Sequence, residues 1–371
     1  MPLEKKLEFS PSQPLTLGVE MELQLLDPKS LALVPKAPQI LGSVPRKSKD
    51  RIKEEFIQSM VEITTGICQD VSQVEKDLID TYELLEKLAK SAGCILYASS
   101  LHPFSSPYEQ QLTKGKRYAR ILEELRITVR RLITQGLHIH VGIDDREELI
   151  RVFDRMRTYL PILLALTTSS PYFQGYDTGL HSFRSKLFEA LPRTGIPDAM
   201  GSWHAFSQLI RLLKRFKAIE QIRDIWWDVR PHPEFGTIEI RICDVPSRMQ
   251  DILGICALVQ CIVSALLKGR LPDAPGIRQF IVINKWQAVR YGLKGRFIYP
   301  NGIRCATFSK VAQELIQALE AEASKLSCKH YLSSLERVIK HGPSSNMQRH
   351  IYRQTLNFQE MINRVRKEFW K

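Results

Sequence analysis

The sequence lacks both glycine-rich loops that commonly hold nucleotide phosphates, since neither GxxxxGK[ST] nor a GxGxxG after a strand occurs in its 371 residues. It also lacks any C-x-x-C pair, and its seven cysteines are scattered along the chain. A zinc site built from cysteines is therefore not expected, and the thiols are predicted to be mostly buried and free in a reducing cytosol. A nucleotide bound by this chain would need another means of holding its phosphates.

No segment has the pattern of a membrane or targeting sequence. The N-terminus is charged but has no apolar core, so no secretory signal is expected. The longest apolar stretch, 252–267, is interrupted by polar residues and is shorter than the roughly 18 to 20 residues that span a bilayer. The stretch therefore predicts a buried helix. Together with the missing signal, it leads us to expect a cytoplasmic protein with no membrane partner.

Internal repeats and clear linkers are also missing, so we expect a single domain over residues 1–371.

The charge balance is basic, with 53 Lys and Arg against 40 Asp and Glu and a net charge of +13. A net positive charge attracts anions, but it does not indicate which anion the protein binds. A basic module for nucleic acid or another polyanion is one interpretation, based on segments 285–304 and 349–371. No RNP-like or zinc-finger pattern supports it, and a solvated cationic face explains the same charge, so no nucleic-acid partner is expected.

Polar residues occur two apart at three places among apolar residues, which is the spacing of one face of a strand. The pairs are Glu20 with Glu22, His138 with His140, and Glu239 with Arg241. On each strand the two side chains point the same way, roughly 7 Å apart. Like charges side by side on a sheet repel, so a Glu-x-Glu pair tends to persist where a cation compensates it. Oxygen and imidazole ligands of this kind hold magnesium or manganese.

Two further sets of residues are candidates for the same site. Glu55 and Glu62 are seven apart, which places them on opposite faces of a regular strand, so they share one site only if a turn or bulge intervenes. Arg184 and Arg230 carry the planar guanidinium fork that matches carboxylates and phosphates.

The periodicity of apolar residues predicts a mixture of helices and strands. Strands are expected near 15–27, within 50–70, and near 94–99, 138–143, 225–230 and 237–243. Helices are expected near 74–92, 118–132, 144–168, 203–220, 248–268, 277–291, 308–325 and 330–341, with a basic helix at the C-terminus. Residues 169–202 show no strong periodicity and are expected to form a functional loop.

Several segments together, in order, resemble the carboxylate–amine ligase family, also called glutamate–cysteine ligase type 2. They are GVEMELQLLDP (18–28), EEFIQSMVEITTGIC (54–68), GLHIHVGI (136–143), SPYFQGYDTGLHSFR (170–184), WWDVRP (226–231), FGTIEIRICDVP (235–246) and NKWQAVRYGLKG (284–295). The resemblance covers about residues 15–300, leaving a helical, basic part at about 305–371. It implies an α+β, glutamine-synthetase-like fold, with a mainly antiparallel curved sheet, helices on one face and an active-site funnel on the other.

The resemblance also implies an activity and a set of site residues. The activity is ATP-dependent amide formation between a carboxylate such as glutamate and an amine such as cysteine, through an acyl phosphate, in a homo-oligomer such as a dimer. The positions expected to ligate magnesium, or manganese, are Glu20, Glu22, Glu55, Glu62, His138 and Glu239. Arg241, His140 and Arg184 match catalytic positions, and Arg230, Arg241 and His140 match positions that contact the nucleotide.

The residues themselves agree with this activity but leave an alternative open. Phosphoryl transfer needs charge neutralisation and alignment more than covalent help, which gathered carboxylates, cations and arginines would supply. A metal-dependent hydrolase could use the same carboxylates and histidines to activate water. A requirement for ATP, a carboxylate and an amine together would separate the ligase from the hydrolase.

Overall fold

A seven-stranded sheet forms the centre of the computed structural model, which describes residues 7–272 and 276–371. Its strands are β1 (Leu17–Leu26), β2 (Ile52–Glu54), β3 (Met60–Thr64), β4 (Ile95–Tyr97), β5 (Leu137–Gly142), β10 (Val229–His232) and β11 (Thr237–Ile240). The order is β10-β11-β5-β1-β3-β2, with β4 also paired to β1, and every pairing is antiparallel.

The strand β1 shows why one face of this sheet is polar. Val19, Met21 and Leu23 are buried in the main hydrophobic core, whereas the alternate residues Glu20 and Glu22 are partly exposed on the other face. This is the alternation predicted from the sequence, and it separates a packed face from a chemically active face.

Three helices cover the packed face: α2 (Val71–Ser91), α4 (Arg146–Met156) and α8 (Met249–Leu267). The helix α2 begins at Asp70, whose side chain accepts a hydrogen bond of 3.0 Å from Gln73 N–H. Within the described residues α8 is the one helix long and apolar enough to cross a membrane, but 89% of that stretch is buried in the protein. It is the buried helix that the apolar stretch predicted.

The remaining elements extend this layer and close the opposite side. They are α1 (Ala37–Ser43), α3 (Lys116–Arg130), α5 (Leu160–Thr167), α6 (Phe183–Glu189), α7 (Trp203–Arg215), α9 (Arg278–Tyr291), α10 (Phe308–Ala318), α11 (Glu320–Lys325), α12 (Lys329–Ser333), α13 (Leu335–His341), α14 (Ser344–Thr355) and α15 (Phe358–Arg366). Short strand pairs join β6 (Tyr172–Phe173) to β7 (Tyr176–Asp177), β8 (Thr194–Gly195) to β9 (Trp226–Trp227), and β12 (Arg296–Ile298) to β13 (Cys305–Thr307).

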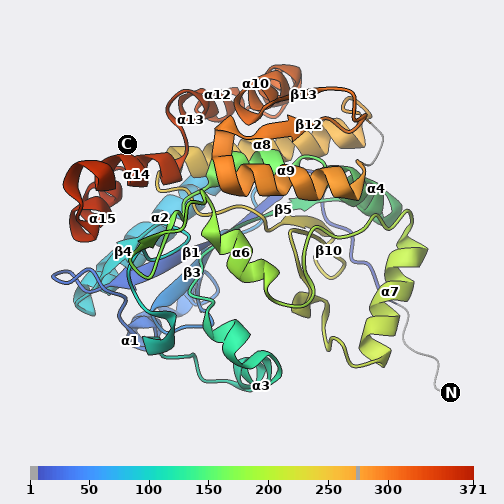
Figure 1. The fold of residues 1–371 in the computed structure, drawn as a ribbon. Helices are drawn as coiled ribbons and strands as arrows, with labels where there is room; N and C mark the ends of the chain where they lie inside the picture. The colour runs from blue at the N-terminus through green and yellow to red at the C-terminus, as the bar shows by residue number, and fades with distance from the viewer. Residues whose placement is uncertain (1–6, 273–275) are drawn as a thin grey trace.

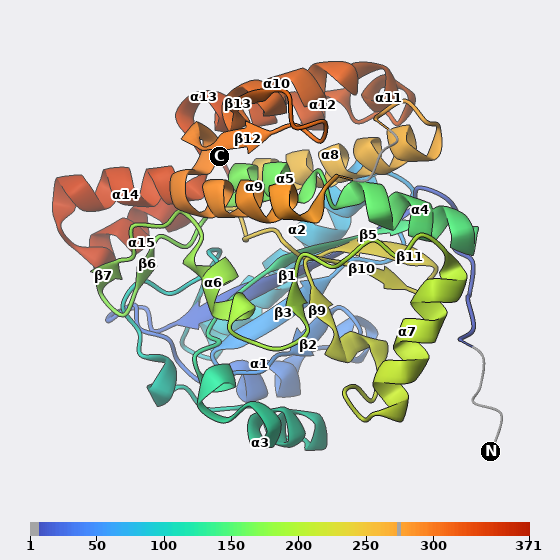
Figure 2. The ribbon, with the colours of Figure 1, turned by 45° about the vertical axis from the view of Figure 1, so that its right-hand side comes forward.

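The sheet lies between two unlike layers (Figure 1). In both views α8, α9 and the C-terminal helices α10–α13 lie on one side of the sheet, and α3 lies on the other (Figure 2). The predicted α+β class, with an antiparallel main sheet, is therefore confirmed. The thiols also follow the prediction, since all seven cysteines are free and only Cys305 is exposed.

Several predicted boundaries are wrong, each for a local reason. The helix expected over 144–168 is two helices, because Pro161 begins a new helix at the first turn of α5 and cannot continue the previous one. The helices expected over 308–325 and 330–341 are likewise each divided in two. The strand expected at 225–230 is β9 followed by β10, and the 169–202 loop contains α6, whose first turn is capped by Ser182.

Candidate active site

A row of charged side chains crosses the polar face of the sheet because the strand register aligns them. In the ladder Arg230 lies opposite Glu239, and Glu239 lies opposite His140. Directly paired residues on neighbouring strands have side chains close enough to interact. The sheet therefore brings together residues that are 99 positions apart in the sequence, as Glu239 and His140 are.

The row continues across the next strands. Glu20 on β1 lies opposite His138 on β5, and Glu22 lies opposite Glu62 on β3. Glu55 follows β2 directly, in the connection that turns the chain into β3. The turn that the odd spacing of Glu55 and Glu62 required is present, so both carboxylates reach one site.

Three groups of side chains have ligand atoms within 4.8 Å of one another among the described residues: Glu20 with His140 and Glu239, Glu20 with Glu62 and His138, and Glu22 with Glu55 and Glu62. Glu20 and Glu62 each belong to two of the groups, so the three groups form one continuous cluster. Carboxylate oxygens with an occasional imidazole suit magnesium or manganese, so these donors fit the predicted cations.

At one end of the row, Glu239 is fully buried and already compensated by two guanidinium groups. Arg230 Nε donates to Glu239 Oε2 at 2.7 Å, and Arg241 Nη1 pairs with Glu239 Oε1. Burial alone would raise the pKa of Glu239, but the charges of Arg230 and then Arg241 hold it well below its usual range. The predicted placement of Arg241 beside Glu239 is therefore what the structure shows.

In the middle of the row, Glu20 is held ionised by the histidines. His138 Nδ1 lies 3.2 Å from Glu20 Oε2, and His140 Nε2 lies 3.7 Å from Glu20 Oε1. Burial opposes ionisation, but the hydrogen bond from His138 and the charges of His140 and His138 lower the pKa of Glu20 to about 2. Burial and the nearby Arg241 lower the pKa of His138 to about 4.

The far end of the row is different, because Glu22, Glu55 and Glu62 are crowded together and the charges of Arg184, Arg117 and Lys53 offset their burial and mutual repulsion only in part. Burial, followed by repulsion from Glu55, raises the pKa of Glu22 to about 8. Burial and the other carboxylates also raise the pKa of Glu62, whose nearest cation is Lys53 Nζ at 3.7 Å. The crowding makes this end of the row the part that most needs a cation.

A cavity of about 650 Å³ opens above the row, between the sheet and α3, and is called here the α3 cavity. Glu20, Glu22, Glu55, Glu62 and His138 form its charged floor together with Arg230 and Arg241. This volume is within the range of small-molecule sites. Most of the predicted residues therefore converge on one cavity.

Sequence reasoning missed several residues of this cavity on α3 and β9. Arg117, Tyr118 and Trp226 line it, and the Nε of Arg117 is buried with no hydrogen-bond partner. An arginine and a tyrosine at the start of an amphipathic helix look like solvent-facing residues in a sequence. No pattern in the chain indicated that α3 would lie over the sheet.

A second cavity of about 520 Å³, called here the N-terminal cavity, adjoins the other end of β1. It is lined by Ser10, Ser12, Gly18, Thr65 and Phe235, among others, and by Glu20 and His140 of the row. Glu20, Lys53, Glu234 and Phe235 line both cavities, so the two chambers meet along these four residues.

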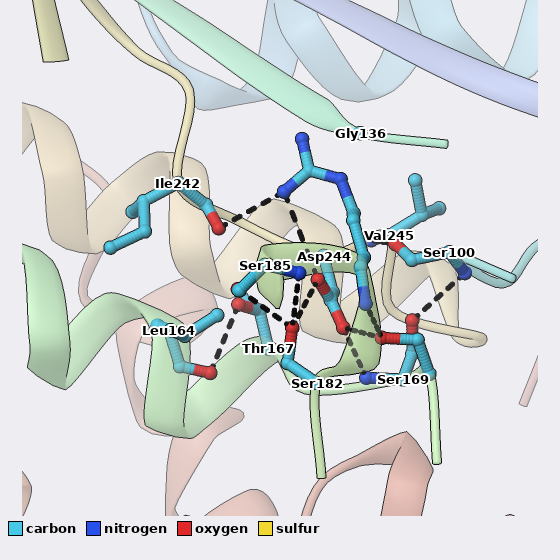
Figure 3. Close-up of polar contacts among 12 residues, drawn as sticks. Ser100, Gly136, Leu164, Thr167, Ser169, Ser182, Ser185, Ile242, Asp244 and Val245 are labelled. Atoms are coloured by element: carbon cyan, nitrogen blue, oxygen red, sulfur yellow. Dashed lines mark hydrogen bonds and ion pairs between the residues drawn. The ribbon is translucent and has the colours of Figure 1, made fainter. Parts of the chain in front are cut away.

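Arg184 lines neither cavity and lies behind the row instead. Its Nη1 donates to Ile242 O at 3.3 Å and lies 3.8 Å from Asp244 Oδ1. Asp244 is fully buried and accepts hydrogen bonds from Ser169 N–H at 2.9 Å and Ser182 Oγ at 3.0 Å, an arrangement visible in Figure 3. Arg184 therefore acts on Glu22 from within the protein. Its positive charge lowers the pKa of Glu22 and so offsets part of the rise that burial causes.

Gly136 makes this arrangement possible. Its N–H donates to Glu22 Oε2 at 2.6 Å, which fixes that carboxylate at the edge of β5. A Cβ at this position would lie 2.5 Å from Arg184 Nη2 and 2.8 Å from His138 Nε2, so any larger residue would displace these two side chains.

Comparisons with known proteins identify the family of this chain. The family model "Glutamate-cysteine ligase family 2" matches residues 16–367. A Gloeobacter violaceus protein called "Putative glutamate--cysteine ligase 2" is 37% identical over 359 residues, covering 94% of this chain and 95% of the relative. A Thermobifida fusca protein of the same name is 37% identical over 372 residues, covering 98% and 93%.

A solved structure shows the same fold at low sequence identity. The glutamate–cysteine ligase of Francisella tularensis, solved in complex with AMP, superposes with a TM-score of 0.71 at 14% identity, covering 97% of this chain and 90% of that one. The fold and the family place this protein in the class of ATP-dependent ligases that form carbon–nitrogen bonds. The chain belongs to glutamate–cysteine ligase family 2. Family membership thereby favours the ligase over the hydrolase and the polyanion-binding module.

Proposed function

We propose that this ligase joins a carboxylate such as glutamate to an amine such as cysteine at the row of carboxylates, with magnesium as the cation. The observation that carries the proposal is the continuous set of three donor groups beside the α3 cavity. Glu20, Glu22, Glu55, Glu62, His138 and Glu239 would hold the cations. When bound, magnesium would neutralise the ATP phosphates and polarise the transferred phosphoryl group.

The cationic and imidazole side chains of the row would have different roles in the reaction. Arg241 is held beside Glu239 with its fork at the cavity, where it can stabilise the charge of the phosphoryl group in transfer. His140 contacts Thr237 Oγ1 at 2.9 Å, which fixes its ring beside Glu20. Arg230 accompanies Arg241 at the cavity, whereas Arg184 acts as a positioning residue from behind.

The chemistry takes place in two steps on the substrates. A carboxylate oxygen of the acid attacks the γ-phosphorus of ATP, and ADP leaves. The amine nitrogen then attacks the acyl carbon, inorganic phosphate leaves, and the amine loses a proton. An unprotonated carboxylate of the row can accept that proton.

The two chambers offer separate places for the nucleotide and the other substrates. The N-terminal cavity has the hydroxyl groups of Ser10 and Ser12 and the ring of Phe235, which stacks on His232 with ring centres 4.1 Å apart, beside the charged Asp50, Lys53 and Glu234. The hydroxyl groups and the ring suit a nucleoside better than the crowded carboxylates Glu22, Glu55 and Glu62 of the α3 cavity do. ATP would then reach the row from one side, and the acid and amine from the other.

The test is phosphate release measured with ATP, magnesium and pairs of amino acids. We expect release only when ATP, a carboxylate and an amine are all present, and loss of release when the cation is chelated. Hydroxylamine is a small nucleophile that converts an acyl phosphate into a stable hydroxamate, so hydroxamate should form with the acid that the enzyme accepts. Release without any amine or acid would contradict the proposal.

We also propose that the protein is a homodimer and that it is cytoplasmic. Sedimentation tests the first statement and cell fractionation the second.

A further inference from the structure

The α3 cavity is lined by two arginines, Arg117 and Arg223, that form no ion pair with any residue that the structure describes. The other two arginines of the cavity are both paired with Glu239. Arg223 is exposed to solvent, whereas the Nε of Arg117 is buried and has no hydrogen-bond partner. A buried donor without an acceptor is costly, so Arg117 is the one of the two that needs a partner anion.

The packing of α3 fixes the position of Arg117. Its guanidinium lies over the ring of Tyr118, 5.8 Å from the ring centre, and that ring packs edge-on against Phe56 with 5.8 Å between centres. Arg120 Nη2 lies 3.1 Å from Asp224 Oδ1, which ties the first part of the helix to the segment before β9. Arg117 therefore reaches the cavity from an anchored helix.

The charge of Arg117 acts on Glu55, but the two side chains form no ion pair. Burial raises the pKa of Glu55, and the charge of Arg117 offsets part of that rise. The ligand atoms of Glu55 lie within 4.8 Å of those of Glu22 and Glu62, so in the proposed function its charge serves a cation. The first turn of α3 has no acidic residue that would pair with Arg117 instead. A partner anion for Arg117 is therefore expected from outside the chain.

Resting on the proposed function, we propose that Arg117 binds the carboxylate that does not react, namely the α-carboxylate of an amino-acid substrate. The reacting carboxylate belongs beside the phosphoryl group, at Arg241. A second carboxylate is repelled by Glu22, Glu55 and Glu62 on the sheet, so it is favoured on the side of the cavity that α3 forms. A guanidinium presents paired N–H donors that match a carboxylate in geometry and charge.

Both glutamate and cysteine carry an α-carboxylate, so the first experiment removes it from each substrate in turn. 4-Aminobutyrate is glutamate without this group, and cysteamine is cysteine without it. Phosphate release is measured with ATP and magnesium, varying one substrate while the other is saturating, in the wild type and in Arg117→Ala. We expect Arg117→Ala to lower kcat/KM about 10²-fold, mainly through KM, for the substrate whose carboxylate Arg117 binds. The analogue without the carboxylate should react equally well with both enzymes.

The two arms identify the source of the carboxylate. A loss with glutamate but not with 4-aminobutyrate assigns Arg117 to the acid, and a loss with cysteine but not with cysteamine assigns it to the amine. Losses of the same size with substrates and analogues would overturn the proposal, because they indicate a structural role. Unchanged kinetics would overturn it as well. A rise in the KM for ATP alone would also do so, since Arg117 would then bind a phosphate.

Two further variants separate binding from folding. Arg117→Lys keeps the charge but loses the paired donors, so it should recover only part of the kcat/KM that Arg117→Ala loses. Arg130→Ala is the matched control, because Arg130 lies on the same helix but is exposed and does not line the cavity. It should react like the wild type with all four compounds, and a loss equal to that of Arg117→Ala would contradict the proposal. Urea unfolding should give the same stability for both alanine variants.

The two proposals fail in different ways. If hydroxamate forms but Arg117→Ala does not distinguish a substrate from its analogue, the ligase proposal stands and the proposal for Arg117 is wrong. If no acid gives hydroxamate, the ligase proposal fails, and calorimetric binding of the same four compounds still tests Arg117. A preference for the compound with the carboxylate that Arg117→Ala removes would support the proposal, and equal binding of compound and analogue would overturn it.

Discussion

At the scale of single residues, neighbouring carboxylates of one row have opposite electrostatic environments. Glu239 and Glu20 are stabilised as anions by arginines and histidines, so their pKa values are lowered. Glu22 lies two residues along β1 from Glu20, and Glu62 lies opposite Glu22 on β3; burial and repulsion between carboxylates raise the pKa values of both. All four residues are glutamates, so the difference in pKa comes from the charged side chains that the neighbouring strands place beside each one.

The prediction for Glu20 follows from its place in two donor groups and in both cavities. Glu20→Gln keeps the size of the side chain but removes its charge, so we expect ligase turnover to fall about 10²-fold or more. Turnover is measured as magnesium-dependent phosphate release. Glu83→Gln, at an exposed position on α2, is the control and should be unaffected. A Glu20→Gln enzyme with the wild-type rate would show that Glu20 has no part in catalysis.

The raised pKa of Glu22 predicts how stability depends on pH. Burial, then repulsion from Glu55, raises it from 4.5 to about 8. A carboxyl whose pKa is higher in the folded state contributes stability that is complete below pH 4.5 and is lost as pH rises through 8. Between pH 6.5 and 8 the metal-free protein should lose about 2 kcal/mol of unfolding free energy, since each pH unit costs about 1.4 kcal/mol.

Urea unfolding at several pH values measures this loss. The buried His138 has a pKa lowered from 6.5 to about 4, so it is already neutral in this window and does not oppose the trend. Glu22→Gln should reduce the pH dependence, and added magnesium should restore stability more at pH 8 than at pH 6.5. A pH dependence that is the same in wild type and Glu22→Gln would rule out Glu22 as its origin.

At the scale of elements, buried Asp244 joins its own segment after β11 to two others behind the row. It accepts from Ser169 after α5, from Ser182 at the start of α6, and lies 3.8 Å from Arg184. These contacts fix the end of the sheet to the helix that carries Arg184. The arrangement of the polar face therefore depends on a buried hydrogen-bond network that lies outside the cavity.

Asp244→Asn should destabilise the protein by about 2–4 kcal/mol, because both carboxylate oxygens accept hydrogen bonds and the NH2 group that replaces one of them can only donate. It should also lower turnover, since Arg184 loses the charge beside it. The free energy of unfolding is measured in urea. Asp145→Asn is the control, because Asp145 caps α4 through Glu147 N–H and asparagine caps equally well. Stability losses of the same size in both variants would contradict the special role of Asp244.

At the scale of the whole molecule, one hydrophobic cluster contains residues from Leu17 to Phe369. It joins the sheet, α8 and the C-terminal helices, so we propose that the chain is a single catalytic domain and that its basic C-terminal part is integral. Differential scanning calorimetry should then show one transition, with the loss of C-terminal helices and of the sheet at the same temperature. A separate early transition assigned to α10–α15 would contradict a single domain.

Much of the active-site row was predictable because strands alternate with a period of two. The spacing of Glu20 and Glu22, and of His138 and His140, defined one face without any knowledge of neighbours. The apolar stretch that became α8 was equally clear from composition. Helix ends were less clear, because the division at Pro161 or at Leu319 depends on packing and turns as much as on periodicity.

The sequence by itself determined the chemistry of the site, since alternation and residue type fixed which carboxylates and histidines share a face. Only the tertiary structure decided which of them are ionised, because charge partners come from strands distant in the chain. It also decided that α3, a helix with an ordinary amphipathic pattern, lines the same cavity. Contacts of this kind depend on the arrangement of elements in space, which local spacing does not encode.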